Sequence, residues 1–154
     1  MVKLLFTEPQ EVLQVLNYFY EISPPMGDRD SFTILKSYTE QMQRQLIDGP
    51  VKITNEHYED FYCSVAKIAM YLTKKPFNEN EFANFLHKKH MMYGAEPLLR
   101  WKHLGIIMRI DAKVSRINNM LVNKLKSDSE SIEDNLKDIV GYCVHGILII
   151  QKGI

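Results

Sequence analysis

The chain has little of what would mark an exported, zinc-binding or membrane-spanning protein. Only two cysteines, Cys63 and Cys143, occur among 154 residues, and both lie in apolar helical patterns. This favours buried thiols in a reducing compartment over a disulfide framework or a zinc site. The longest apolar stretch near the C-terminus, residues 146–150, is far too short to span a bilayer. Acidic residues follow the short apolar run at the N-terminus, which is untypical of a signal peptide, so we expect a cytoplasmic protein.

An excess of charge of one sign is also missing. Nineteen basic residues balance nineteen acidic ones, so the net charge is zero. A balanced chain gives no global electrostatic reason to bind nucleic acid or an anionic membrane. A nucleic-acid-binding helical module is therefore the weakest functional hypothesis, and only binding with a steep salt dependence would revive it.

Glycine and proline are few, and they divide the chain into helical segments. Apolar residues recur at helical spacing between these breaks, and only residues 51–54 hint at a strand. The predicted helices span about residues 9–22, 31–48, 55–73, 78–92, 97–126 and 130–151. Five or six helices with short links favour an all-α helical bundle, a single domain over residues 1–154 with two long antiparallel helices at its C-terminal end.

A basic stripe lies on the predicted 97–126 helix. Arg109, Lys113 and Arg116 are spaced four and three residues apart, which places them on one face. Three cations together can bind phosphates, although a solvated face with exposed ion pairs explains the same spacing. Gly105 lies one turn before Arg109, where the missing side chain leaves room for a ligand or another helix.

An acidic stripe lies on the predicted 130–151 helix. Glu130, Asp134 and Asp138 are each four residues apart, and Gly141 and His145 continue the same row. Carboxylates at this spacing can share a hard cation such as Mg²⁺, which can bridge to substrate phosphates. The alternative is that the acids favour the helix dipole and that Asp138 pairs with the facing basic stripe.

The histidines show no metal-binding pattern. His87 and His90 flank two lysines, which favours a small basic cluster at a solvated helix end. Neither a nucleophile elbow nor a glycine-rich phosphate loop occurs in the sequence.

Residues 88–150 resemble the nucleotide modification associated domain 1 family of bacteria and their phages. The segment RIDAKVSRINNML is similar to one helix of that family, and the segment ESIEDNLKDIVGY is similar to the helix that follows it. The matching positions are Lys88 or Lys89, Tyr93, Gly94, Gly105, Arg109, Ile110, Lys113, Arg116, Glu130, Ser131, Ile132, Asp134, Asp138 and Tyr142. Residues 1–80 resemble no family and form a helical half without an assigned role.

The resemblance implies a nucleotide site between the last two helices. The family is similar to all-α nucleoside triphosphate pyrophosphatases of the MazG type, which hold Mg²⁺ with acids on two neighbouring helices. By that resemblance, Glu130, Asp134 and Asp138 would hold Mg²⁺, with Asp134 and Asp138 catalytic. The phosphates would lie on Lys89, Arg109, Lys113 and Arg116, and Tyr93, Gly94, Gly105 and Tyr142 would complete the site. The chain departs from the pyrophosphatases because its first site helix carries cations in place of E-x-x-E, with Asp111 the only nearby acid.

Two functional hypotheses from different classes follow. The first is a nucleotide-handling protein of phage or bacterial DNA nucleotide modification, either a Mg²⁺-dependent (deoxy)nucleoside triphosphate pyrophosphatase or a degenerate relative that only binds nucleotides. The second is a non-catalytic helical adaptor or inhibitor, a phage accessory protein whose N-terminal half contacts a host protein. In either case we expect no membrane contact, and a homo-oligomer is the natural assembly for a bundle of the pyrophosphatase kind.

Overall fold

Six helices and no strand make up the described part of the chain. The computed structural model describes residues 4–22, 31–49, 52–73, 78–123 and 131–154. The helices are α1 (Pro9–Ile22), α2 (Ser31–Asp48), α3 (Asn55–Thr73), α4 (Glu79–Tyr93), α5 (Glu96–Asn123) and α6 (Ile132–Gln151). The prediction of an all-α bundle is therefore confirmed, and the helix bounds follow the apolar spacing closely.

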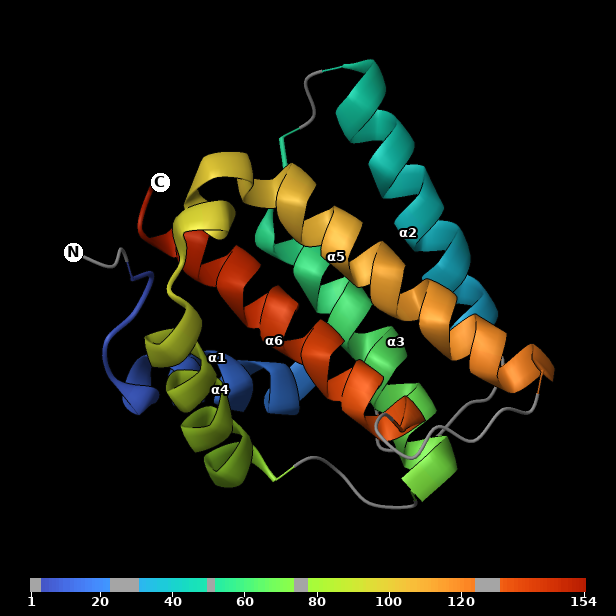
Figure 1. The fold of residues 1–154 in the computed structure, drawn as a ribbon, viewed down its shortest axis with the longest axis horizontal. Helices are drawn as coiled ribbons and strands as arrows, with labels where there is room; N and C mark the ends of the chain where they lie inside the picture. The colour runs from blue at the N-terminus through green and yellow to red at the C-terminus, as the bar shows by residue number, and fades with distance from the viewer. Residues whose placement is uncertain (1–3, 23–30, 50–51, 74–77, 124–130) are drawn as a thin grey trace.

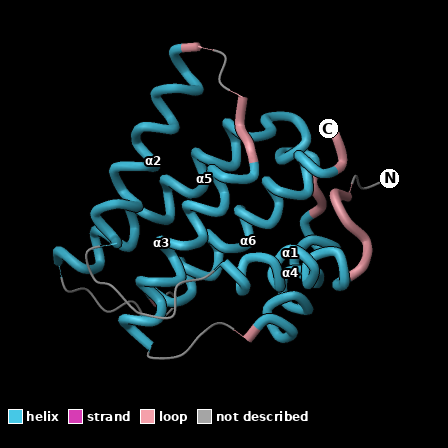
Figure 2. The backbone as a smooth tube through the Cα atoms, turned by 180° about the vertical axis from the view of Figure 1, so that it is seen from behind, coloured by secondary structure: helices cyan, strands magenta, loops and turns pink. Residues whose placement is uncertain are grey.

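Helix α6 lies at the centre of the bundle (Figure 1). It packs against α5 and α3, while α2 covers α3 and α5, and α1 packs across α4. In Figure 1, α5 runs away from the chain ends and α6 returns toward them, so the predicted antiparallel pair is confirmed. Seen from behind, α1 and α4 lie together to one side of the four longer helices (Figure 2).

The sequence of α6 explains its central place. Between Asn135 and Ile149 this helix is buried at every position except Lys137, Asp138 and Tyr142, which are half-buried. A helix that is apolar nearly all round is stable only inside a core. Among the described helices, none is both long and apolar enough to cross a bilayer.

A glycine allows α3 and α6 to cross closely. The ring of Tyr58, which is fully buried on α3, lies directly over Gly146 of α6. A Cβ at this position would overlap the Tyr58 ring, so only glycine fits the crossing. The Tyr58 hydroxyl shares a 2.6 Å hydrogen bond with Nδ1 of His103 on α5, which links all three helices.

Helix α5 is broken at Lys102, which the sequence prediction of one continuous helix missed. Lys102 has φ 51° and ψ −131°, a conformation that glycine adopts far more readily than other residues. Two helical pieces, residues 96–101 and 103–123, therefore meet at an angle. Before the break, Pro97 and Leu98 turn toward α4, and after it α5 follows α6.

The first described residues pack into the core. Leu5 and Phe6 are buried, and the backbone N–H of Leu5 donates a 2.8 Å hydrogen bond to Nε2 of His90 on α4. Lys152, just beyond α6, donates to the Leu5 carbonyl and pairs with Glu11 at 2.7 Å. The solvated basic cluster predicted around His87 and His90 is therefore wrong for His90, whose ring is buried under this segment.

Candidate functional site

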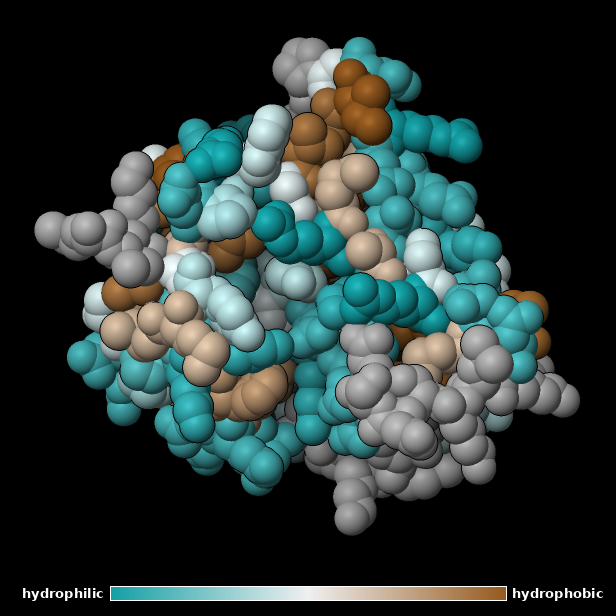
Figure 3. All heavy atoms as spheres, viewed as in Figure 1, coloured by the Kyte–Doolittle hydropathy of each residue, from teal (hydrophilic) through white to brown (hydrophobic). Residues whose placement is uncertain are grey.

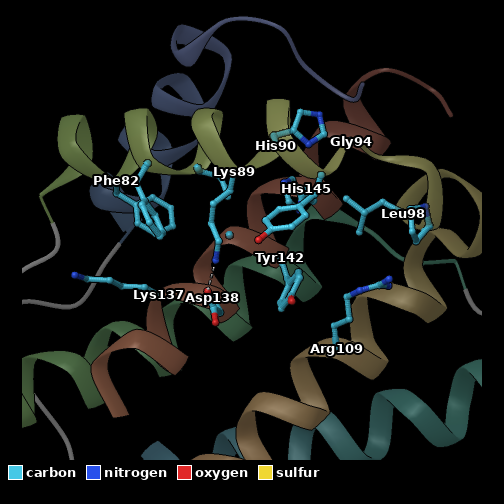
Figure 4. A pocket seen from close by; sticks show the side chains of 15 residues that line it. Phe82, Lys89, His90, Gly94, Leu98, Arg109, Lys137, Asp138, Tyr142 and His145 are labelled. Carbon is cyan, nitrogen blue, oxygen red and sulfur yellow. Dashed lines mark hydrogen bonds and ion pairs between the residues drawn. The ribbon is translucent and has the colours of Figure 1, made fainter. Parts of the chain in front are cut away.

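A pocket of about 390 Å³ opens between α4, the first turns of α5 and α6 (Figure 4). Its volume lies in the range of roughly 300–1,000 Å³ that is typical of small-molecule sites. The apolar part of its lining is Phe82, Phe85, Leu86, Pro97 and Leu98. The polar part is Lys89, His90, Tyr93, Arg109, Lys137, Asp138, Tyr142 and His145, with Gly94 and Gly141 between them. A mostly apolar wall with several convergent polar groups is the usual composition of a binding pocket.

The exposed side of α6 faces this pocket. Lys137, Asp138 and Tyr142, the three half-buried residues of its central stretch, all line it. Gly141 lies among them, and a Cβ there would lie 3.1 Å from Cδ1 of Leu86 on α4. The glycine therefore lets the apolar side chains of α4 approach α6 at the wall of the pocket.

Asp138 is held by two lysines from different helices. One carboxylate oxygen lies 2.9 Å from Nζ of Lys113 on α5, and the other lies 3.4 Å from Nζ of Lys89 on α4. Figure 4 shows Lys89 pointing from α4 toward Asp138. Because the carboxylate is only 22% exposed and Lys113 only 15%, the three side chains form a partly buried ion network. The basic and acidic stripes of the sequence thus meet here.

Arg109 faces the same pocket without a carboxylate partner. Its Nη1 donates a 3.2 Å hydrogen bond to the carbonyl of Gly105, one turn earlier on α5. Within the described ranges, no carboxylate lies within ion-pairing distance of this guanidinium. A Cβ at Gly105 would meet Trp101 Cβ at 2.7 Å and Arg109 Nη1 at 3.1 Å. The space beside Gly105 is therefore occupied by side chains of its own helix.

The acids predicted to bind Mg²⁺ are engaged otherwise or lie outside the described residues. Asp134 forms a capping box at the start of α6: its backbone N–H donates to Ser131 Oγ at 3.0 Å, and its carboxylate accepts from Ser131 N at 3.3 Å. Asp138 is paired with lysines, and Glu130 falls outside the described residues. Among the described residues, no group of three or more His, Cys, Asp or Glu side chains could hold a metal ion. Asp134 and Asp138 are thus engaged in a helix cap and an ion network, and Mg²⁺ binding by the three acids stays a prediction.

Two buried histidines line the inner part of the pocket. His90 is 3% exposed, accepts the Leu5 hydrogen bond and stacks on Phe6 at 4.2 Å between ring centroids. His145 is 8% exposed, and neither of its ring nitrogens has a hydrogen-bonding partner among the described residues. Burial lowers the pKa of His145 to about 3 and that of His90 to about 4. Both imidazoles are therefore neutral at physiological pH.

The structure brings together about half of the predicted site residues. Lys89, Tyr93, Gly94, Arg109, Asp138 and Tyr142 line the pocket, and Lys113 reaches it through Asp138. Gly105 borders a separate shallow groove with Trp101 and Met108, while Arg116 is exposed and Asp134 caps α6.

Sequence reasoning named Lys89, Tyr93 and Gly94 at the end of α4, but it missed the apolar part of the α4 wall, Phe82 and Leu86, and gave His145 no role. His145 stands in the row of Asp138 and Gly141, which is the one sequence signal that pointed to it.

Comparisons of the chain with protein-family models, with curated proteins and with solved structures found no match. The resemblance to the nucleotide modification family thus stays a prediction from the sequence, and the function is argued from the pocket.

Proposed function

We propose that this protein binds a small organic phosphate, in the first place a nucleotide or nucleoside phosphate, in the pocket between α4, α5 and α6. The observation that carries the proposal is Arg109, a guanidinium that faces a small-molecule pocket and is paired with no carboxylate among the described residues. A guanidinium presents several N–H donors in a planar fork, which matches the oxygens of a phosphate.

The charges around the pocket support an anionic ligand. Lys89, Arg109, Lys113 and Lys137 supply four cations, against the carboxylates of Asp138 and of Glu133, which lies 3.6 Å from Lys137. Among the described residues around the pocket, the cations therefore outnumber the carboxylates, although the chain as a whole is neutral. Figure 3 shows hydrophilic side chains gathered across the middle of this face, over α5 and α6. A positive concave surface with apolar walls raises the local concentration of an anion.

The apolar wall supports a ligand that is more than a phosphate. Phe85 and Tyr93, which line the pocket, are 48% and 72% exposed, and an organic group would cover part of their surface. Inorganic phosphate alone would leave this wall in contact with water. A nucleoside phosphate has an anionic group that suits the cations of the pocket and a flat, weakly polar base that suits its apolar wall.

The ion network argues for binding without hydrolysis. A Mg²⁺ ion at Asp138 would have to displace Lys113 and Lys89, and Asp134 would have to leave the capping box. Among the two forms of the nucleotide hypothesis, the geometry therefore favours the nucleotide-binding relative that lacks pyrophosphatase activity.

Replacing Arg109 tests the proposal. Arg109→Ala removes the guanidinium from the pocket, and hydrogen bonds to a charged group contribute about 1.5–3 kcal/mol, so nucleotide affinity should fall about 10- to 100-fold. The measurement is calorimetric titration with nucleoside mono-, di- and triphosphates in EDTA. The control is Arg100→Ala, which removes an exposed arginine paired with Glu96 on the same helix but outside the pocket.

Three results would decide the matter. Weakened binding in Arg109→Ala together with unchanged binding in Arg100→Ala supports the proposal. Equal loss in both variants, or no binding to the unaltered protein, contradicts it. Release of pyrophosphate from triphosphates in Mg²⁺ would restore the enzymatic form of the hypothesis.

The adaptor hypothesis has a candidate surface at the end of α4, which lies beyond the N-terminal half named for it and borders the pocket through Tyr93. Met91, Met92 and Tyr93 at the end of α4 are 47%, 67% and 72% exposed, a run of large hydrophobic residues of the kind that is enriched in protein interfaces. If this run binds a partner protein, Met92→Ser should weaken a stoichiometric complex and leave nucleotide titrations unchanged.

A further inference from the structure

His145 presents an unexplained buried polar group at the pocket. Its side chain comes from the most buried stretch of α6 and lines the cavity, as Figure 4 shows. Both Nδ1 and Nε2 are inaccessible to solvent in the protein, and neither has a hydrogen-bonding partner among the described residues. Buried polar side chains are nearly always hydrogen-bonded, so an exception at a pocket wall points to a ligand contact.

The aromatic rings around His145 give its two nitrogens no hydrogen bond among the described residues. Phe6, His90 and Tyr142 are its ring neighbours, with centroids at 6.1, 5.6 and 6.4 Å. His90 is engaged elsewhere, because its Nε2 accepts the hydrogen bond from Leu5. These rings hold the His145 imidazole in place. An environment of aromatic rings suits a flat, uncharged group of a ligand.

The protonation state of His145 determines which ligand groups can form hydrogen bonds with it. Desolvation by burial, together with nearby His90 and Arg109, lowers the pKa of His145, so the ring carries one N–H donor and one acceptor nitrogen. A phosphate is matched by cations and several donors, which Arg109 on α5 and Lys89 on α4 supply in the lining of the same pocket. A ring that offers one donor and one acceptor is matched by a neutral polar edge, such as that of a nucleobase.

We propose that His145 is a specificity-determining residue that hydrogen-bonds the base of a nucleoside phosphate, while Arg109 holds the phosphate. The proposal rests on the proposed function and deepens it, since it assigns the base and the phosphate to different residues of one pocket. The base lies against the apolar wall, and its polar edge satisfies a nitrogen of His145. Sugar phosphates without a base therefore bind more weakly.

The test compares ligands that differ only in the base. The four ribonucleoside 5′-monophosphates and ribose 5-phosphate are titrated in EDTA into the unaltered protein and into His145→Phe. Phenylalanine keeps an aromatic ring of similar size at this position but offers no hydrogen bond. At least one nucleotide should bind the unaltered protein about tenfold or more tightly than ribose 5-phosphate, and His145→Phe should lose that preference while binding ribose 5-phosphate as before. His87→Phe, which replaces a histidine of α4 outside the pocket lining, is the matched control and should keep the preference.

A second measurement does not depend on the variant folding. The imidazole ¹⁵N chemical shifts of His145 in the unaltered protein should move when the preferred nucleotide binds and stay in place with ribose 5-phosphate. Phosphate binding with no preference for a base, with a preference that survives in His145→Phe, or with unmoved His145 shifts overturns this inference and leaves the proposed function standing. Absence of binding by both nucleotides and ribose 5-phosphate overturns the proposed function itself.

Discussion

At the scale of single residues, the two pocket histidines make the stability of the protein depend on pH. Their pKa values in the folded protein, about 4 for His90 and about 3 for His145, lie below the value of about 6.5 expected in an unfolded chain. As pH falls through 6.5, the unfolded chain takes up protons that the folded protein cannot accept. Each buried histidine should therefore lower the free energy of unfolding by about 1.4 kcal/mol per pH unit, down to its own folded pKa.

Urea denaturation between pH 7 and 4.5 measures this dependence. The unaltered protein should lose stability on acidification, and His145→Phe should remove the contribution of one histidine, so its curve of unfolding free energy against pH should be flatter by about 1.4 kcal/mol per unit below pH 6. The carboxylates are the same in both proteins, and their contribution cancels in the comparison. Two parallel curves would show that His145 titrates like an exposed histidine.

The carboxylate of Asp138 partly neutralises the positive charge beside the pocket. Its carboxylate joins Lys89 and Lys113, so three helices meet through one side chain. The arrangement explains how a neutral chain keeps a locally positive pocket: the acid neutralises part of the cluster and leaves Arg109 without a carboxylate partner among the described residues.

At the scale of the elements, the break in α5 stores strain beside the pocket. Lys102 has a positive φ that side-chain-bearing residues rarely adopt, at a cost of about 1–3 kcal/mol. Pro97 and Leu98 reach the pocket from the short piece before the break, while Arg109 reaches it from the long piece after it. The strained residue therefore joins the two parts of α5 that contribute to the site.

Lys102→Gly should relieve this strain. Because glycine adopts such a conformation without a steric penalty, the variant should be more stable by about 1 kcal/mol, as measured by urea denaturation at neutral pH. Lys102→Ala is the matched control, since it removes the same side chain without freeing the backbone, and it should show no such gain. Equal stability of the two variants would mean that the backbone at Lys102 is not strained.

At the scale of the whole molecule, the sequence was sufficient for the helices and their order. Apolar positions such as Ile110, Val114 and Ile117 recur at helical spacing, and all three are buried as that spacing predicts. The long apolar stretch of the last helix likewise predicted its place in the core. These features are local, so they can be read without knowing how the helices pack.

The parts that the sequence did not reveal depend on packing between distant segments. No glycine or proline marks the break at Lys102, and nothing near Leu5 or His90 shows that they lie together. The basic and acidic stripes were visible from their spacing, but the apolar part of the α4 wall was not, since Phe82 and Leu86 meet α6 only in the folded bundle. His145 was visible only as a member of the acidic row, because its significance comes from burial without a partner.

The central claim is that the pocket holds an organic phosphate through its positive charge and without a metal, and Asp138→Asn tests it most directly. The substitution keeps the shape of the side chain but removes the negative charge between Lys89 and Lys113. Nucleoside phosphates titrated in EDTA should therefore bind Asp138→Asn a few-fold more tightly than the unaltered protein, because one more positive charge faces the ligand. Binding in EDTA that is unchanged or weakened in Asp138→Asn, or binding that appears in either protein only when Mg²⁺ is added, would contradict the claim.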